Sequence, residues 1–434
     1  MMFEKYDAYK DSGVDWIGSI PSHWYIKKAK FLFVESDERS NTGSEELLSV
    51  SHMTGVTPRA EKNVSMFMAE DYSGSKLCKR DDLVMNIMWA WMGALGVSAY
   101  EGIVSPSYGV YRQKNPKSFN SKYLEYLLKS TKYIEYYNQV STGLHSSRLR
   151  FYGHMFLNMK LGFPDLNEQD NIIGFLNKKT TEIDQAISIK EQQIALLNER
   201  KQIVIQQAVT QGLDPNVPMK DSDVEWIGLI PEHWELKKIK HVTSKIGSGV
   251  TPSGGGATYL DEGIPLLRSQ NIHFDRIDLN DVARISEKVH HSMSNSKVRK
   301  NDVLLNITGG SIGRCYFVET SDEMNVNQHV CILRPKKNIT SIFLNAVLAS
   351  EVGQGQIWYF QQGGGREGLN FQALKNFDIA LPPIGEQILI SKKVEEIYQQ
   401  FGNVNAHIQM QIEKLKEYKT TLINDAVTGK IKVA

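Results

Sequence analysis

Side chains that could do chemistry are spread along this sequence of 434 residues without the spacing that catalysis requires. The glycine-rich loop at 247–256 lacks the lysine and the serine or threonine of a P-loop, and no G-x-G-x-x-G opens a helix. The histidines form no His-x-x-x-His pair, and no Ser-His-Asp arrangement is evident. Pro164-Asp165 is better explained as a turn before a helix than as a nuclease motif. The sequence therefore predicts no catalytic site on this chain.

Cysteine count and charge narrow the class of protein further. Cys78, Cys315 and Cys331 are odd in number and lack any C-x-x-C spacing, so we expect neither a disulfide framework nor a zinc site. A reducing cytoplasm is the expected location, because no signal-peptide run opens the sequence and no 18 consecutive apolar residues occur. The net charge of +1 argues against binding nucleic acid through bulk positive charge, but it allows local basic surfaces.

The elements that must position any binding loops occur twice. Residues 11–24 (Asp-Ser-Gly-Val-Asp-Trp-Ile-Gly-Ser-Ile-Pro-Ser-His-Trp) return at 221–234, 210 positions later. The motif Pro-x-x-x-Glu-Gln, which ends at Gln169, returns 218 positions later and ends at Gln387. The chain is thus two tandem copies, each with a tryptophan segment, a globular body and a long helix. Two related surfaces suit a target with two half-sites, above all duplex DNA.

The globular bodies, about 25–160 and 235–378, are predicted to mix strands and helices. In the first body, 46–51 and 82–88 are β-rich apolar runs, and 122–137 has near-helical apolar spacing. Asp82 and Asn86 recur as Asp302 and Asn306, 220 positions later, and the pair Arg150-Phe151 is aligned with Asn370-Phe371 at the same offset. We predict an α+β fold, with two tandem α/β domains joined by two long helices in a pseudo-twofold arrangement.

Each long helix should extend for roughly 40 residues, or about 60 Å at 1.5 Å per residue, with one narrow apolar stripe. The first stripe contains Ile172, Leu176, Ile183, Ile187, Ile194, Leu197, Val204 and Ala208. The second contains Ile390, Val394, Ile397, Phe401, Val404, Ile408, Ile412, Leu415 and Leu422. Since the nearest partner for each helix is its own copy, we expect an intramolecular antiparallel coiled coil; pairing with a partner's helices is the alternative.

The tryptophans of the two 11–24 and 221–234 segments could serve either of two purposes. Trp16, Trp24, Trp226 and Trp234 could anchor a loop to its own domain or contact a partner, and we favour the anchor. We place these four tryptophans in one set of candidate partner or coiled-coil contacts. The other members of the set are Ile183, Ile187, Ile194, Leu197, Ile397, Phe401, Ile408 and Leu415.

Four motifs together resemble the DNA-specificity subunit of type I restriction-modification systems. They are the tryptophan segments, the Pro-x-x-x-Glu-Gln helix starts, the run Asp302-Val-Leu-Leu-Asn-Ile-Thr-Gly-Gly-Ser-Ile-Gly with Asn325-Val-Asn-Gln-His-Val, and Gly364-Gly-Arg-Glu-Gly-Leu-Asn-Phe371. The first body departs from the pattern, with Trp89-Ala-Trp91 and Ser105-Pro-Ser-Tyr108 where the second has Thr308-Gly-Gly and Asn327-Gln-His329.

The resemblance implies two target-recognition domains, in residues 1–160 and 213–378, and conserved long helices in 161–212 and 379–434. It also implies a bipartite DNA site, two adenine-N6 methyltransferase subunits and an ATP-dependent translocating endonuclease subunit. S-adenosylmethionine, ATP and Mg would then be bound by those partners and no cofactor by this chain, which would be non-catalytic.

A recognition domain of this kind needs amide, guanidinium and hydroxyl groups on loops that reach base edges, while lysine and arginine contact phosphates. In the first body the candidates for DNA binding are Trp91, Ser105, Tyr108, His145, Ser146, Arg148 and Arg150, although Trp91 also suits a core role. In the second body they are Thr251, Ser253, Arg268, Gln270, Asn271, Ser311, Arg314, Arg366 and Glu367.

Two alternatives remain open from the sequence. The chain could serve an orphan methyltransferase complex that has no nuclease. It could also be a coiled-coil adaptor that binds no DNA, although polar, glycine-rich loops in both bodies speak against this.

Overall fold

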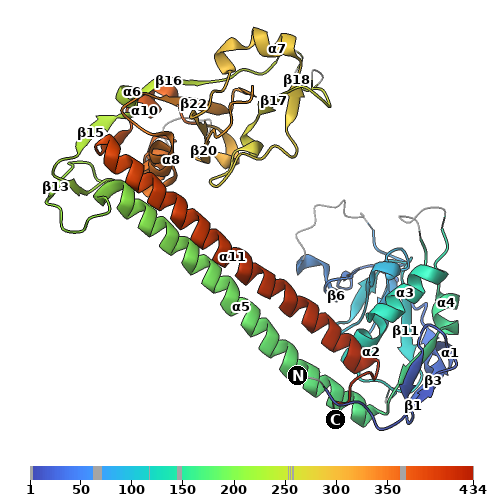
Figure 1. Ribbon diagram of the computed structural model, residues 1–434. Helices are drawn as coiled ribbons and strands as arrows, with labels where there is room; N and C mark the ends of the chain where they lie inside the picture. The colour runs from blue at the N-terminus through green and yellow to red at the C-terminus, as the bar shows by residue number, and fades with distance from the viewer. Residues whose placement is uncertain are drawn as a thin grey trace. The chain divides into compact units, whose positions relative to one another are not determined.

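The chain forms two compact units. The computed structural model describes residues 3–61, 71–116, 118–143, 149–252, 254, 256, 259–361 and 368–433. Unit 1 consists of Met1–Ile189 and Met410–Ala434, and unit 2 consists of Lys190–Gln409. Each unit therefore contains one globular body and part of both long helices, α5 (Leu166–Gln211) and α11 (Ile384–Val427) (Figure 1).

Unit 1 is built around a four-stranded antiparallel sheet in the order β4–β11–β8–β9. Its strands are β4 (Phe33–Glu35), β8 (Leu83–Met85), β9 (Leu95–Val97) and β11 (Gly109–Gln113). Four antiparallel pairs flank it: β1 (Tyr9–Asp11) with β2 (Ser19–Pro21), β3 (Tyr25–Lys28) with β12 (Lys160–Phe163), β5 (Leu48–Ser51) with β6 (Gly55–Pro58), and β7 (Lys76–Cys78) with β10 (Gly102–Val104). The helices are α1 (Ala29–Leu32), α2 (Ser121–Leu128), α3 (Thr131–Val140) and α4 (Gly153–Asn158).

Unit 2 repeats this plan with the order β16–β22–β19–β20. These strands are β16 (Thr243–Ser248), β19 (Val303–Asn306), β20 (Cys315–Phe317) and β22 (Val330–Pro335). The pairs are β13 (Met219–Asp221) with β14 (Leu229–Pro231) and β15 (Glu235–Lys238) with β23 (Asp378–Leu381), and a further sheet has β18 (Ala283–Ile285), β17 (Ile264–Leu267) and β21 (Asn325–Val326) in that order. The helices are α6 (Ile239–Val242), α7 (Glu287–Ser292), α8 (Ser341–Ala349), α9 (Glu351–Gln361) and α10 (Phe371–Lys375).

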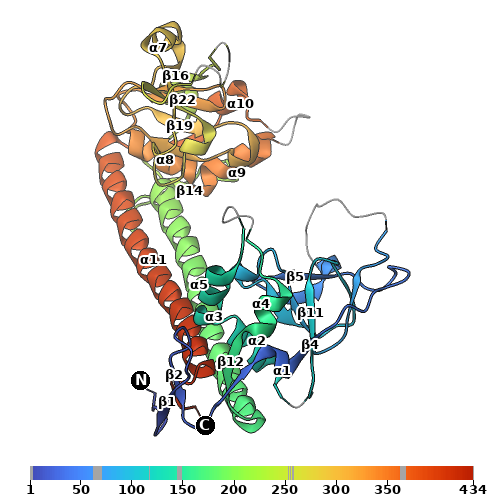
Figure 2. The ribbon, with the colours of Figure 1, turned by 90° about the vertical axis from the view of Figure 1, so that its right-hand side faces the viewer.

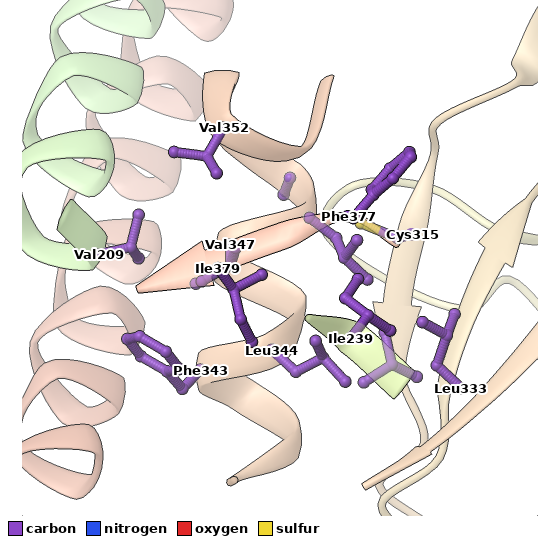
Figure 3. Packing of buried hydrophobic residues seen from close by; sticks show 14 of the residues in the cluster. Val209, Ile239, Cys315, Leu333, Phe343, Leu344, Val347, Val352, Phe377 and Ile379 are labelled. Atoms are coloured by element: carbon purple, nitrogen blue, oxygen red, sulfur yellow. The ribbon is translucent and has the colours of Figure 1, made fainter. Parts of the chain in front are cut away.

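A helix covers the last strand of the central sheet in each unit. In unit 1, α2 packs against β9, and in unit 2, α8 packs against β20. Figure 2 shows α8 beside β19 of the same sheet. Side chains at the starts of α2 and α8 accept backbone hydrogen bonds, Asn120 from Lys122 and Tyr123 and Thr340 from Phe343. In Figure 3, Phe343, Leu344 and Val347 of α8 lie between Val209 of α5 and Leu333 of β22. Each body thus shares one apolar core with its segments of the long helices.

The long helices pair antiparallel, as predicted. In unit 2, the Asn405 Nδ2 donates to Asn198 Oδ1 at 2.9 Å, and Lys201 Nζ lies 5.4 Å from the centre of the Tyr398 ring, so residue numbers rise on α5 as they fall on α11. In unit 1, Lys419 binds Asp184 at 2.7 Å. The predicted stripe is buried in large part, with Ile183 at 6% exposure and Ile397 at 3%. Val404 was assigned to the stripe wrongly, because its side chain is 46% exposed.

The tryptophan segments close the ends of the long helices. In unit 2, α5 is followed by Gly212, whose φ of +78° is the left-handed conformation that favours glycine, and a Cβ there would lie 3.3 Å from Trp234. In unit 1, Gly429 after α11 has a φ of +73°, and a Cβ there would lie 2.6 Å from Pro21. Trp24 and Trp234 are each only 1% exposed. These two tryptophans are therefore anchors within their own units, which is the interpretation favoured from the sequence.

Three details differ from the sequence-based expectations. The single helix expected at 122–137 is two helices, because Ser130 takes an extended conformation between α2 and α3. The predicted domain boundaries after 160 and 378 fall within β12 and β23. The alignment of Arg150-Phe151 with Asn370-Phe371 was wrong: Phe151 N donates to Ile87 O as Leu369 N donates to Ile307 O, so the offset at this point is 218 rather than 220.

Candidate nucleic-acid interface

A buried ion pair fixes the central strands in both bodies. Arg112 of β11 binds Asp82 through two hydrogen bonds of 2.9 Å, and Arg334 of β22 binds Asp302 through two of 2.8 Å. Both aspartates are 1% exposed. Paired bonds between a guanidinium and a carboxylate set distance and angle together. We call this pair the Asp–Arg fork. It explains why Asp82 recurs as Asp302.

The fork of unit 1 has an additional partner. Arg112 also binds Glu38 at 2.8 Å, and hydrogen bonds from Lys79 and Arg112 lower the pKa of Glu38 to about 2. The hydrogen bonds to Asp82 and Glu38 raise the pKa of the Arg112 guanidinium. In unit 2, Arg334 instead donates to the Lys297 carbonyl at 3.4 Å. The shared part of the fork therefore positions the strands, while its surroundings differ.

The Glu-Gln pair at the start of each long helix connects three elements. Glu168 accepts from Trp24 Nε1 at 3.1 Å and contacts His23 Nε2 at 2.7 Å; Glu386 does the same with Trp234 at 2.9 Å and His233 at 2.6 Å. The glutamine that follows is fully buried in both copies. Gln169 Oε1 accepts from the Asn120 backbone, and Gln387 Oε1 accepts from the Thr340 backbone. This motif thus ties the tryptophan segment, the long helix and the loop before α2 or α8 together.

Four loops meet at one edge of unit 2, which we call the polar edge: those after β16, β17 and β19 and the one before β22. Backbone hydrogen bonds join them, from Gly249 N to Asn327 O at 3.1 Å, Asn327 N to Leu267 O at 3.0 Å and Ile307 N to His329 O at 3.0 Å. Antiparallel pairing of β16 and β19 with β22 produces this arrangement, because both strands end where β22 begins. Polar residues far apart in sequence are therefore brought together.

Several predicted DNA-binding residues lie on this edge. Arg268 stacks its guanidinium over the Tyr259 ring at 5.7 Å, and its Nε has no hydrogen-bond partner among the described residues. Gln270 is exposed. Ser311 Oγ accepts from Asn306 Nδ2 at 3.2 Å, and the same amide donates to Ser269 O at 2.8 Å. Asn306, which was singled out only as a repeat marker, thus holds two loops together.

Two predicted residues of unit 2 are placed differently. Asn271 is 3% exposed, and its amide bonds to Arg268 N and Asp278 O, so it stabilises its own loop. Arg314 lines a cleft of about 750 Å³ together with side chains of both long helices, including Lys201 and Tyr398. This cleft also contains His273. Arg314 therefore lies beside the long helices, while its backbone carbonyl accepts from Asn306 N at 2.8 Å.

A chain of side chains on the polar edge was missed among the sequence candidates. Thr251 Oγ1 donates to Gln328 Oε1, Gln328 Nε2 lies 2.9 Å from His329 Nε2, and His329 Nδ1 lies 2.6 Å from Thr308 Oγ1. Thr251 was a candidate, but Thr308, Gln328 and His329 were not. The sequence did contain a signal for these residues. Thr308-Gly-Gly and Asn327-Gln-His329 occupy the positions at which the first body has a different sequence.

The corresponding edge of unit 1 is more aromatic. Asn86 Nδ2 donates to the Tyr108 hydroxyl at 3.1 Å, and burial raises the pKa of Tyr108. Trp91 Nε1 donates to Met88 O at 3.0 Å, and Trp91 O accepts from Asn138 Nδ2, so Trp91 is held within the unit. Its neighbour Trp89 is 43% exposed, with the two ring centres 5.9 Å apart.

The remaining candidates of unit 1 lie on two loops. Ser105 and Tyr108 line a cavity of about 330 Å³ that also contains Arg59. Arg150 forms a backbone bridge with Thr142, and its guanidinium donates to Leu149 O at 3.0 Å.

Six candidates from the two units lie outside the described residues: His145, Ser146, Arg148, Ser253, Arg366 and Glu367.

Within the described residues, no group of three histidine, cysteine, aspartate or glutamate side chains is arranged to hold a metal. Burial raises the pKa of Cys78 to about 11 and that of Cys331 to about 12. Among the helices that the structure describes, none has the length and apolarity needed to cross a membrane. What the described edges offer is hydrogen-bond donors, acceptors and aromatic rings, groups of the kind that can pair with base edges.

Known proteins resemble this chain in sequence and in fold. The family model of the type I restriction modification DNA specificity domain matches residues 231–414. The specificity subunit of the type I restriction enzyme EcoBI from Escherichia coli is 29% identical over 279 residues, which are 62% of this chain and 58% of that protein. The MjaVIII specificity subunit from Methanocaldococcus jannaschii is 26% identical over 358 residues, 80% of this chain and 79% of that protein.

Two solved structures share the fold. A chain from a study of complex assembly and conformational transition of the type I R-M system gives a TM-score of 0.67 at 15% identity, covering 94% of this chain and 98% of that one. The HsdS subunit from Thermoanaerobacter tengcongensis gives 0.53 at 15% identity, covering 95% and 98%. The resemblance to the specificity subunits of type I restriction-modification systems, inferred from the motifs of this chain, is therefore confirmed.

Proposed function

We propose that this chain recognises a bipartite site in duplex DNA, with each body reading one half, and directs adenine-N6 methylation and ATP-dependent restriction by partner subunits. The observation that carries the proposal is that both bodies have the same Asp–Arg fork and Glu-Gln pair but different side chains on the edge that the fork supports. Two domains that each recognise a different DNA sequence need the same internal contacts but different side chains on the surface that contacts DNA.

The two edges differ in the base-pair features that they suit. Amide, hydroxyl and imidazole groups on the polar edge of unit 2 match the donor and acceptor patterns of the major groove. In unit 1 the exposed Trp89 ring and the Tyr108 hydroxyl offer apolar contact and a single polar group. We therefore expect the two half-sites to differ in sequence.

Catalysis in this proposal belongs to other subunits. A methyltransferase must rotate its target adenine out of the helix into its own pocket, so no residue of this chain would touch the reacting atom. Two methyltransferase subunits and an endonuclease subunit would bind S-adenosylmethionine, ATP and Mg. A surface for such partners is available on α5, where Ile189, Leu196 and Ile203 recur every seven residues and are 56%, 64% and 49% exposed.

Exchange of one body tests the proposal. Replacing residues 25–160 with the first domain of another specificity subunit should change one half of the methylated motif and leave the other half intact. Sequencing methylated adenines in cells that contain the exchanged chain and its methyltransferase would report both halves. Reciprocal exchange of residues 235–378 is the matched control and should alter the other half. Changes in both halves from a single exchange would contradict independent reading.

A further inference from the structure

We infer that Gln328 is a binding site for an adenine base in the half-site read by unit 2, with Thr251 and His329 as the residues that position its amide. This inference rests on the proposed function and names the base at one position of the target. Gln328 is exposed, next to the start of β22. The argument depends on how its hydrogen-bonding groups are used.

The hydrogen bonds of the four-residue chain have a defined direction. An amide nitrogen can only donate, so His329 Nε2, 2.9 Å from Gln328 Nε2, accepts. The neutral imidazole then carries its proton on Nδ1 and donates it to Thr308 Oγ1 at 2.6 Å. At the other end, the Thr251 hydroxyl donates to Gln328 Oε1. Both ends of the amide are thus hydrogen-bonded, the oxygen to a hydroxyl and the nitrogen to an imidazole.

Each end of the amide has one hydrogen-bonding position left. The oxygen keeps one lone pair and the nitrogen keeps one hydrogen, and together they form an adjacent acceptor and donor. Adenine presents the complementary pair in the major groove, with its N6 amino group as donor and N7 as acceptor. Guanine presents two acceptors, O6 and N7, so its O6 would face the amide oxygen. Cytosine and thymine each present one polar group there, which leaves half of the amide unpaired.

Support at both ends also lowers the cost of binding. A free glutamine side chain loses rotamer freedom when it binds, whereas Gln328 is already held by two neighbours. Beside Thr308, Gly309 and Gly310 are exposed, and a Cβ at either would meet no atom of the described residues within 4 Å. A carboxylate would repel DNA, and none takes part in the hydrogen bonds that join Thr251, Gln328, His329 and Thr308.

The described residues of unit 1 include no equivalent of this site. The register of β22 with β19 and of β11 with β8 aligns Arg334 with Arg112, so Gln328 and His329 correspond to Pro106 and Ser107. Proline has no side-chain donor or acceptor. Recognition of adenine through a supported glutamine amide should therefore be confined to the second half-site.

The test uses the complete chain assembled with its methyltransferase subunits. Once methylated-adenine sequencing has given the native motif, binding is titrated on the native duplex and on duplexes substituted at each position. Gln328→Ala should reduce discrimination at one adenine of the second half-site by about 10- to 100-fold, the range expected for loss of a bidentate base contact. Gln328→Glu keeps the shape but replaces the donor by an acceptor, and should shift the preference toward cytosine. Gln372→Ala, an exposed glutamine on α10, is the control and should leave every position unchanged.

The positioning residues have their own matched variants. Thr251→Val removes the hydroxyl and should relax the same adenine position by about 3- to 10-fold, whereas Thr251→Ser keeps the hydroxyl and should restore it. Weaker binding by Gln328→Ala that is equal on all duplexes would overturn the inference, as would relaxation at a first-half position or no change. If the unmodified complex shows no preference among duplexes, the proposed function itself fails, which is a distinct outcome.

Discussion

Units 1 and 2 share the contacts that position their strands and long helices, and they differ at the edge that the strands carry. Asp82 and Asp302 accept the same pair of hydrogen bonds from arginine, and Gln169 and Gln387 bond to equivalent backbone groups. At the edge, by contrast, Asn86 bonds to a tyrosine hydroxyl in unit 1, while Asn306 bonds to Ser269 and Ser311 in unit 2. The comparison separates a frame that tolerates little change from an edge that can change freely, and substitutions in matched positions can test that separation.

The largest effect is expected in the buried stripe of α11. Ile397 is 3% exposed in unit 2, and the position 218 residues earlier is Lys179, which binds Glu182 at the surface of unit 1. Ile397→Lys should therefore cost about 4 to 5 kcal/mol in unfolding free energy, because it buries an unpaired charge. Val404→Lys, at a 46% exposed position, should cost little. Urea unfolding followed by circular dichroism would measure both, and equal losses would contradict the assigned stripe.

Removing the carboxylate of the Asp–Arg fork should come next. Among the described residues, Asp302→Ala leaves Arg334 with only the Lys297 carbonyl, and we expect a loss of about 3 to 4 kcal/mol. Asp82→Ala should cost less, about 2 to 3 kcal/mol, because Arg112 keeps Glu38 at 2.8 Å. Unfolding of the single variants and of Asp82→Ala with Glu38→Ala would check this. The double variant should approach Asp302→Ala; a larger loss for Asp82→Ala alone would refute the role of Glu38.

The Glu-Gln pairs should show a smaller difference between units. Glu168 has three polar contacts, to His23, Trp24 and Tyr6, and its side chain is 14% exposed; Glu386 has two and is 39% exposed. We expect Glu168→Ala to cost about 2 kcal/mol and Glu386→Ala about 1 kcal/mol. Thermal unfolding monitored by tryptophan fluorescence is suitable, since Trp24 and Trp234 are the donors. A larger loss for Glu386→Ala than for Glu168→Ala would show that the number of polar contacts does not determine how much each glutamate stabilises its unit.

The frame could be predicted from the sequence because its signals are local. The apolar stripes and the recurring Glu-Gln motif lie within single helices, so the two long helices could be predicted from their spacing, and their antiparallel pairing from the duplication. The break at Ser130 could not be predicted, because apolar residues at helical spacing continue from α2 into α3 on either side of it.

The polar edge could be predicted only in part, because its contacts depend on strand register. Thr251 reaches Gln328 across 77 positions, and Thr308 reaches His329 across 21. Asn271 was predicted to bind DNA from its residue type, but the short helix at Ser269–Asn271 turns its amide inward. A shift of one residue in the pairing of β19 with β22 would have placed different side chains on the edge.

The smallest effect concerns a surface ion pair that one unit has and the other lacks. Asp184 and Lys419 form this pair in unit 1, and the 218-residue offset places Gly402 and Lys201 at the corresponding positions of unit 2. Gly402 is exposed, and a Cβ there would meet no atom within 4 Å, so Gly402→Asp can be accommodated. Lys201 lies over the Tyr398 ring at 5.4 Å and would exchange that contact for the new carboxylate.

The comparison of Gly402→Asp with Gly402→Asn isolates the charge, because aspartate and asparagine have similar helix propensities. We expect the aspartate variant to be more stable by about 0.2 to 0.5 kcal/mol, the lower part of the range for exposed pairs. Asp184→Asn should lose a similar amount in unit 1. Both differences should disappear near 1 M salt, where screening acts over about 3 Å. If the aspartate variant were less stable than the asparagine variant at low salt, Lys201 would not be the counterpart of Lys419, and the alignment of the two long helices would have to be revised at this point.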